Sequence, residues 1–378
     1  MKILIGADFV PTESNFDLFE NGDGENLFGS ELLELLNNAD YRVFNLETPL
    51  TDVLNPITKY GPNLSAPSAC ISGYIAAKAN LLTLANNHIK DQGATGLEAT
   101  IKTLDQNNIC YTGAGENLAQ ASKPFITEIE GTKIGFYACA EHEFSIAEEN
   151  KPGANPYDPL ESFDAVNILS KQCDYLIVLY HGGKENYRYP TPELQKRCRK
   201  FIEKGADLVI CQHSHCIGCQ EKYLSGTVVY GQGNFLFDHS EKETWQTGVL
   251  VLITDKMVSY IPLVKNKNTV RLAKNQDAEK ILEGFYDRSE EIKTPELIEK
   301  NFNDLAKREY YNYLEKFSGK PNKLIYRAMK KLTNGAYKKF YLDRYFNKSS
   351  LIQLENYTDC ETHRELLVES LKLNCNGK

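Results

Sequence analysis

The sequence predicts an α/β fold in which layered β-sheets are flanked by helices. Short apolar runs of four to eight residues recur through the first two-thirds of the chain, and amphipathic stretches separate several of them. The last hundred residues instead carry long helical patterns and few strand signals. A chain of 378 residues with 42% hydrophobic content can bury a substantial core around such elements.

The expected elements follow in chain order. Strands are expected at Lys2–Gly6, Tyr41–Leu46, Asn80–Ala85, Lys133–Ala138, Tyr175–Tyr180, Leu208–Cys211, Thr227–Tyr230, Gly248–Ile253 and Val258–Val264. Helices are expected at Ser30–Asn38, Thr95–Gln106, Pro159–Ser170 and Thr191–Lys204. The tetrapeptide Glu-Gly-Thr-Lys at 130–133 indicates a hairpin turn, so some strand pairs should be antiparallel.

Charge divides the chain into two parts. Residues 1–265 carry a net charge of −13, and residues 266–378 carry +5. Beyond Asp277 the pattern is helical, with Pro295 and Pro321 near expected helix starts. We therefore predict one domain over 1–265 and a helical C-terminal extension over 266–378, divided at the polar run 265–268.

Composition excludes several classes of protein. The net charge of −8 argues against a general nucleic-acid-binding surface, so no nucleic-acid partner is expected. No run reaches the roughly 18 apolar residues of a transmembrane span, and Met1–Asp8 runs directly into a strand without a signal-peptide pattern. Ten cysteines are scattered, mostly in apolar runs, as expected for free thiols. These features predict a cytoplasmic protein.

Four of the seven histidines lie at the ends of expected strands: His88, His181, His213 and His215. Asp8 and Glu47 have the same placement. Because the carboxyl ends of strands in layered α/β folds line a crevice, these side chains are expected to converge. One such histidine alone is more often a structural hydrogen bonder. The whole set favours a site for Zn, Mn or Fe, which bind imidazole, carboxylate and amide groups.

The order of the motifs resembles one family. The motifs are Asp8, Asn45-Leu46-Glu47, Asn86-Asn87-His88 with Asp91 and Gly93, His181-Gly182-Gly183 with Glu185, Gln212-His213-Ser214-His215, and Gly233-Asn234-Phe235. Over residues 1–240 the chain is similar to the CapA-type capsule and poly-γ-glutamate synthesis proteins of the calcineurin-like metallophosphoesterase superfamily. The resemblance implies a four-layered α/β/β/α sandwich and two divalent metal ions.

The resemblance also implies a set of metal ligands: Asp8, Glu47, Asn87, His181, His213 and His215. Asp8 and His215 would hold the first ion, whereas Asn87, His181 and His213 would hold the second. Glu47 stands where the superfamily has a bridging carboxylate, usually an Asp. A second departure is Val10, where many phosphoesterases have a further histidine.

Other site residues have implied roles outside the ligand set. His88 would lie beside the phosphate leaving group, where it could protonate an alkoxide. Asn45 and Asn234 are candidates for substrate binding. Glu185 is a candidate catalytic residue that either fixes a ligand imidazole or contacts substrate, and its alternative is a solvated loop acid.

The expected function is metal-dependent hydrolysis of a phosphoester in capsule, exopolysaccharide or poly-γ-glutamate synthesis. The substrate would be phosphorylated or polyanionic. One alternative is an amide hydrolase of a glutamate polymer, because a dimetal site can activate water for either reaction. Another is a non-catalytic metal-binding scaffold in a polymer-synthesis complex, which the loss of a ligand at Val10 favours.

Three weaker signals have structural explanations that we favour. Cys216-Ile217-Gly218-Cys219 has no second Cys-x-x-Cys and indicates two free thiols. Trp245 is expected in the core. Residues 316–348 hold ten Lys+Arg and one acid, and Ile325, Met329, Leu332, Ala336 and Phe340 fall on one helical face. That segment is either a docking surface for a polyanion or an anionic membrane, or a helix packed with its lysines in water, which we favour.

Overall fold

The computed structural model describes residues 1–238, 241–319 and 324–375. The chain forms two compact units, Met1–Glu299 and Lys300–Lys378. The first unit extends beyond residue 265, since strand β16 (Thr269–Leu272) and helix α9 (Asn275–Glu291) belong to it. The predicted boundary between the metallophosphoesterase-like domain (1–265) and the C-terminal extension (266–378) stays a prediction.

Two sheets form the first unit. One has the strand order β16-β15-β14-β1-β2-β3-β4, with β13 also paired to β1, and the other has the order β11-β12-β10-β9-β7-β6. The strands of the first sheet are β1 (Lys2–Val10), β2 (Tyr41–Asn45), β3 (Leu81–Thr83), β4 (Cys110–Thr112), β13 (Asn234–Phe237), β14 (Thr247–Thr254), β15 (Met257–Asn266) and β16. Those of the second are β6 (Phe125–Ile129), β7 (Thr132–Ala140), β9 (Tyr175–His181), β10 (Leu208–Gln212), β11 (Gln220–Tyr223) and β12 (Gly226–Tyr230). A small third sheet joins β5 (Ala114–Gly115) to β8 (Gly153–Ala154).

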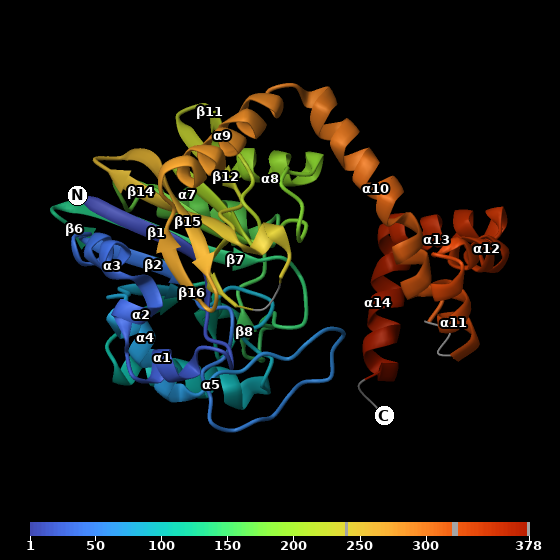
Figure 1. Ribbon diagram of the computed structural model, residues 1–378, viewed down its shortest axis with the longest axis horizontal. Helices are drawn as coiled ribbons and strands as arrows, with labels where there is room; N and C mark the ends of the chain where they lie inside the picture. The colour runs from blue at the N-terminus through green and yellow to red at the C-terminus, as the bar shows by residue number, and fades with distance from the viewer. Residues whose placement is uncertain (239–240, 320–323, 376–378) are drawn as a thin grey trace. The chain divides into compact units, whose positions relative to one another are not determined.

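Helices and short 3₁₀ turns connect these strands (Figure 1). In the first unit they are α1 (Phe16–Glu20), α2 (Gly24–Phe28), α3 (Ser30–Asn37), η1 (Ser68–Cys70), α4 (Ile71–Ala76), α5 (Gly93–Gln106), α6 (Leu118–Ala121), α7 (Glu161–Leu169), α8 (Pro192–Glu203), η2 (Glu243–Trp245) and α9. Helix α10 (Pro295–Phe317) crosses the boundary between the units. It is followed by α11 (Leu324–Leu332), α12 (Ala336–Tyr345), α13 (Lys348–Asp359) and α14 (Glu361–Cys375).

Alternation along the strands produces four layers. In β1, Ile3 and Ile5 face the second sheet, whereas Leu4 packs with the helices of the α1–α5 region. In β9, Ile177 packs between the sheets and Val178 packs under α7 and α8. Successive residues of a strand point to opposite faces, so each sheet is buried on both sides. The expected α/β/β/α arrangement is confirmed.

All nine expected strands and all four expected helices are present, with ends that differ by a few residues. The turn at Glu130-Gly131 joins β6 to β7 as expected, and both residues have positive φ. The short strands β4, β5, β8, β11, β13 and β16 were not expected, because such brief runs carry little periodicity. Strand β7 also extends to Ala140, two residues past its expected end.

The helical extension is confirmed, but its basic segment is not one helix. Helices α11 and α12 are separated at Thr333–Gly335, where Gly335 has φ of 89°. A left-handed glycine ends a helix readily, so the apolar stripe expected across this segment is broken. Pro321 and the side chain of Ile325 lie outside the described residues. Within the described chain, no helix is both long and apolar enough to span a membrane.

Candidate metal centre

Parallel strand pairing brings the expected site residues to one edge of the sandwich. In the first sheet, Asp8 is aligned with Asn45 of β2 and Asn234 of β13. In the second, His181 at the end of β9 is aligned with Gln212 at the end of β10. The registers of Asp8 with both neighbours shift locally, and such an irregularity can re-aim a side chain.

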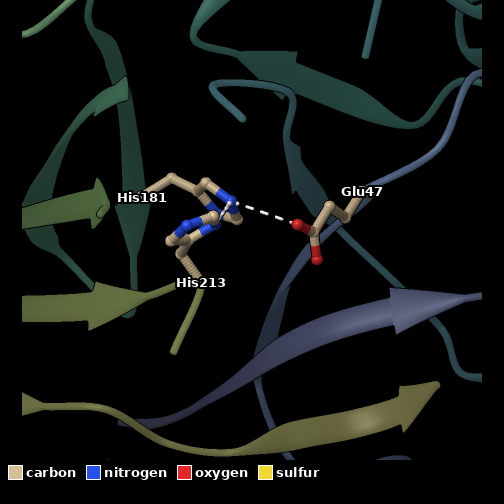
Figure 2. Close-up of side chains that lie close together, drawn as sticks. All are labelled: Glu47, His181 and His213. Atoms are coloured by element: carbon tan, nitrogen blue, oxygen red, sulfur yellow. Dashed lines mark hydrogen bonds and ion pairs between the residues drawn. The ribbon is translucent and has the colours of Figure 1, made fainter. Parts of the chain in front are cut away.

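Glu47, His181 and His213 form one buried group whose ligand-type atoms all lie within 4.8 Å of one another (Figure 2). His181 Nε2 lies 3.2 Å from Glu47 Oε1 and 3.1 Å from His213 Nδ1. Asn87 Oδ1 is 3.0 Å from the same His181 nitrogen. These atoms are arranged around one small volume, as the ligands of a single ion would be.

Asp8, Glu47 and His215 form a second buried group of the same kind. Asp8 Oδ2 lies 3.2 Å from His215 Nδ1. Glu47 therefore belongs to both groups, which is the position of a bridging ligand. All five residues of the two groups are buried, with at most 5% of each residue's surface exposed.

A cation would satisfy groups that the protein leaves unsatisfied. Among the described residues, neither carboxylate oxygen of Glu47 accepts a hydrogen bond. Burial, and then the charge of Asp8, raises the pKa of Glu47 to about 8. Burying an anion without donors costs several kcal/mol unless a positive charge compensates it. The donor set of imidazole and carboxylate groups suits a transition metal, so the residues fit a divalent ion.

The histidines carry opposite pKa shifts. Burial lowers the pKa of His181 to about 4, and burial together with the charge of His181 lowers that of His213 well below its usual range. Both are thus neutral at pH 7, as metal ligands must be. For His215 burial alone would lower the pKa, but the Glu47 charge and the hydrogen bond to Asp8 outweigh it and raise the pKa to about 9. For Asp8 burial opposes ionisation, but the hydrogen bond and charge of His215 hold its pKa below the usual value.

The loop after β10 holds two of these residues in uncommon backbone conformations. His213 has φ of 86° and His215 has φ of 50°. A left-handed conformation costs a non-glycine residue about 1–3 kcal/mol, and it persists where the surroundings require it. Here it directs two imidazoles, separated by Ser214, into the two groups. Such strain is frequent at functional sites.

Asn45 and Asn234 support the ligands. Asn45 is fully buried; it donates to Asp8 Oδ1 over 2.7 Å and accepts from Asn86 and Thr83. Asn234 Oδ1 lies 2.9 Å from His215 Nδ1. These contacts suit the positioning of Asp8 and His215. The expected substrate-binding role of Asn45 and Asn234 stays a prediction. The buried Asn234 Nδ2 has no hydrogen-bond partner among the described residues.

His88 lies beside the ligands in its own hydrogen-bonded cluster. Its Nδ1 is 2.6 Å from Asp91 Oδ2, and the other Asp91 oxygen is paired with Lys59 Nζ. Asp91 is fully buried and also accepts from the backbone N–H of Leu64. The carboxylate fixes the orientation of the ring through Nδ1, and no hydrogen bond to Nε2 is present among the described residues. Lys59, in the long loop after β2, was not expected from the sequence.

Two further acids, Glu141 and Glu143, were missed. Glu141 Oε1 lies 3.6 Å from His213 Nε2, and Glu143 accepts from Asn87 Nδ2 over 3.0 Å. Glu141, Glu143 and His213 also form a third group with metal-compatible spacing, in which the two acids are partly or fully exposed. The strand-end rule applies to them once β7 is seen to end at Ala140. The exposed His142 between them instead lies 3.1 Å from the Tyr157 carbonyl.

The remaining expected residues lie around this centre. Glu185 is exposed in the loop after β9 and makes no hydrogen bond to a ligand imidazole among the described residues, although its charge acts on His213. Val10 packs with Phe237 and Trp245. The Trp245 ring lies 4.2 Å from the His215 ring, so the expected packing role of Trp245 is confirmed. Cys216 and Cys219 are buried free thiols whose pKa values burial raises.

Comparison with known proteins gives one family and several relatives. Residues 5–239 match the family described as "Bacterial capsule synthesis protein PGA_cap". The chain is 30% identical over 219 residues to the capsule biosynthesis protein CapA of Bacillus anthracis, covering 55% of this chain and 53% of the relative. It is 30% identical over 168 residues to the PGA biosynthesis protein CapA of Bacillus subtilis, covering 43% and 44%. The chain thus spans about half the length of these relatives.

One solved structure similar to this chain is a phosphatase from Mycoplasma pneumoniae. It is 16% identical, with a TM-score of 0.42, over 75% of this chain and 96% of that one.

Proposed function

The chain belongs to the family of bacterial capsule synthesis protein PGA_cap, and from that premise we propose that it is a metal-dependent hydrolase of phosphoesters in capsule or poly-γ-glutamate synthesis. The observation that carries the proposal is Glu47, a buried carboxylate shared by two groups of metal-compatible side chains, to which none of the described residues donates a hydrogen bond. Relatives named for capsule and PGA biosynthesis support the biological context.

The ligand assignment that we propose follows the two groups. Asp8 and His215 would hold one divalent ion, His181, His213 and Asn87 would hold the other, and Glu47 would belong to both ligand sets. The chemistry supplied there would be a lowered pKa of water and compensation of phosphoryl charge. Mn, Zn and Fe all suit this donor set.

The residues of the chain have separate tasks in this proposal. Glu143 holds the Asn87 amide so that its oxygen faces His181, and Glu141 faces Nε2 of His213. Asp91 holds His88 by Nδ1, so that Nε2 donates a proton to the departing alkoxide oxygen. The Lys59 ammonium is paired with the other Asp91 oxygen, so Asp91 contacts both Lys59 and His88. Glu185, exposed at the edge, contacts the substrate.

The test is an assay of the purified chain, loaded with Mn or Zn, on an aryl phosphate and on a γ-glutamyl polymer. The proposal predicts turnover of the phosphate that chelation abolishes and that Asp8→Ala and His215→Ala lose. Turnover of the polymer alone would instead establish amide hydrolysis at the same centre. A metal-loaded protein that turns over neither substrate, and whose Asp8→Ala variant keeps its cellular function, would establish a scaffold.

A further inference from the structure

A cavity of about 740 Å³ lies in the first unit away from the candidate metal centre. Among the described residues, none of the expected metal ligands lines it. Its walls include helix α9, the end of β15 and the loops that follow β9 and β10. Two arginines contribute to this lining: Arg188 from the loop after β9 and Arg288 from α9.

The two arginines are held together by neighbouring carbonyl groups. Arg188 Nη1 donates to the Ile217 carbonyl over 3.0 Å, and Arg288 Nε donates to the Gly218 carbonyl over 2.8 Å. Because these acceptors are consecutive in the chain, the guanidinium groups are brought close to each other. Each guanidinium carries five N–H donors, and the described residues accept only one such bond from each. The remaining donors are available to a ligand in the cavity.

Neither guanidinium has a counter-ion among the residues that the structure describes. Within the described parts of the chain, no carboxylate lies within 4.0 Å of either one, and both side chains are only partly exposed. Burial lowers the pKa of Arg288, and the positive charge of Arg188 lowers it further. Two positive charges in a partly buried setting repel each other. An anion between them would offset that repulsion.

The rest of the cavity does not supply a general positive field. Four acids also line it, and none is paired with either arginine: Glu243, Asp277, Glu283 and Asp287. They balance the basic residues of the lining. An anion would therefore be held by directed, charge-assisted hydrogen bonds from the paired guanidiniums, which match the geometry of phosphate and carboxylate.

We propose that Arg188 and Arg288 form a binding site for the phosphate or carboxylate group of a ligand, separate from the metal centre. The site does not depend on the proposed hydrolase activity. The loops after β9 and β10 line the site and also carry Glu185 and His215. The same two loops therefore contribute to this site and to the metal centre.

The test is isothermal titration of the full-length, Mn-loaded protein with inorganic phosphate and, separately, with a short γ-glutamate peptide. Phosphate can also bind the metal centre. Binding at the proposed site is therefore measured as the difference in affinity between the wild-type protein and its arginine variants. We expect Arg288→Gln and Arg188→Gln each to weaken one binding event at least about tenfold, as loss of a charge-assisted contact implies. A matched control is Arg199→Gln, which removes an arginine already paired with Glu221.

The outcomes separate the ligand sources. Loss confined to phosphate identifies a phosphoryl ligand, and loss confined to the peptide identifies a carboxylate ligand. Equal stoichiometry and affinity for both probes in Arg188→Gln, Arg288→Gln and Arg199→Gln would overturn the proposal. If Arg288→Gln does not fold, Arg188→Gln and the charge-conserving Arg288→Lys replace it. Weaker binding of either probe than in Arg199→Gln then supports the site, and equal binding overturns it. A hydrolase assay that fails leaves this result unaffected.

Discussion

At the scale of the residue, the carboxylates of Glu141 and Glu143 contact two proposed metal ligands and fix how those ligands are oriented. Asn87 has two chemically different ends, and only its oxygen can bind a cation. Glu143 accepts from the Asn87 nitrogen, so the oxygen is directed toward His181. Glu141 has the corresponding position behind His213. Partners of this kind fix ligand orientation and affect affinity strongly.

We predict that Glu143→Gln and Glu141→Gln each weaken metal binding by about 10–100-fold, because each removes a carboxylate that orients a ligand. Competition with a chelating dye measures the affinity. Glu148→Gln, which alters an exposed acid paired with Lys151 nearby in the sequence, should leave the affinity unchanged. If all three variants bind metal equally, neither Glu141 nor Glu143 orients a ligand.

Asp91 provides a second test at this scale. We predict that Asp91→Asn lowers kcat by about tenfold to a hundredfold on an alkyl phosphate and less on a nitrophenyl phosphate. A good leaving group needs little protonation, so loss of an oriented His88 should matter less for it. Equal losses on the two substrates would argue that Asp91 maintains structure only. Lys59→Met, which spares the buried carboxylate, should show the same ordering with smaller losses.

At the scale of the element, the sequence predicted the site through one rule and missed part of it through the same rule. Polar residues after apolar runs located Asp8, Glu47, His181 and His215, because parallel strands end at a common edge. Strand β7 was expected to stop at Ala138 but reaches Ala140, so Glu141 and Glu143 were not among the expected site residues. Element ends are the least certain part of a periodic pattern.

Side-chain pairing across distant loops could not be predicted in the same way. Lys59 lies in a long loop without periodicity, and only the folded chain brings it to Asp91. The break between α11 and α12 depends on the left-handed conformation of Gly335. Apolar residues recur every three or four positions on both sides of it, so the sequence pattern does not indicate the break. Layering and core faces were predictable because they depend on patterns that repeat along each strand.

The second unit allows a prediction about its helices. Glu315 of α10 lies 2.7 Å from Lys330 of α11 and 2.9 Å from Lys338 of α12. Burial alone would raise the pKa of Glu315, but hydrogen bonds from the two lysines outweigh it and lower the pKa. The stabilisation is therefore present above the unfolded pKa of a glutamate and is lost as pH falls through the lowered folded value.

We predict that Glu315→Gln destabilises the second unit by no more than about 1 kcal/mol at pH 7, since ion pairs that solvent reaches contribute little. The difference between variant and wild type should shrink as the pH falls below 4. Helix loss followed by circular dichroism in denaturant measures it. A Glu355→Gln control on α13, where no ion pair is recorded among the described residues, should have no such pH dependence. An identical response in the two variants would remove the role given to Glu315.

At the scale of the whole molecule, the metal centre links protonation to stability. Without metal, Glu47 and His215 have folded pKa values of about 8 and 9, above their ordinary values. Groups with raised pKa values stabilise the fold at low pH, and that contribution is lost as pH rises through the folded values. In the proposed ligand assignment a cation would replace those protons, so metal would compete with protons for the same side chains.

We therefore predict that the increase in Tm caused by Mn grows between pH 6 and pH 9. At a free metal concentration about 100 times Kd, one site adds about 2.7 kcal/mol, and a lower proton concentration lowers the apparent Kd. Thermal unfolding with Mn and with chelator, at matched ionic strength, measures the difference. A Tm increase that is constant over this range would mean that Glu47 and His215 are not ligands.

The central claim is that one buried carboxylate, Glu47, serves two metal ions, and metal content tests it most directly. Elemental analysis of the protein loaded with Mn or Zn should find about two ions per chain. Asp8→Ala and His181→Ala should each retain about one ion, whereas Glu47→Ala should lose most of both, with helix content unchanged in all three variants. A wild-type chain that holds no transition metal, or a Glu47→Ala variant loaded like the wild type, would contradict the account.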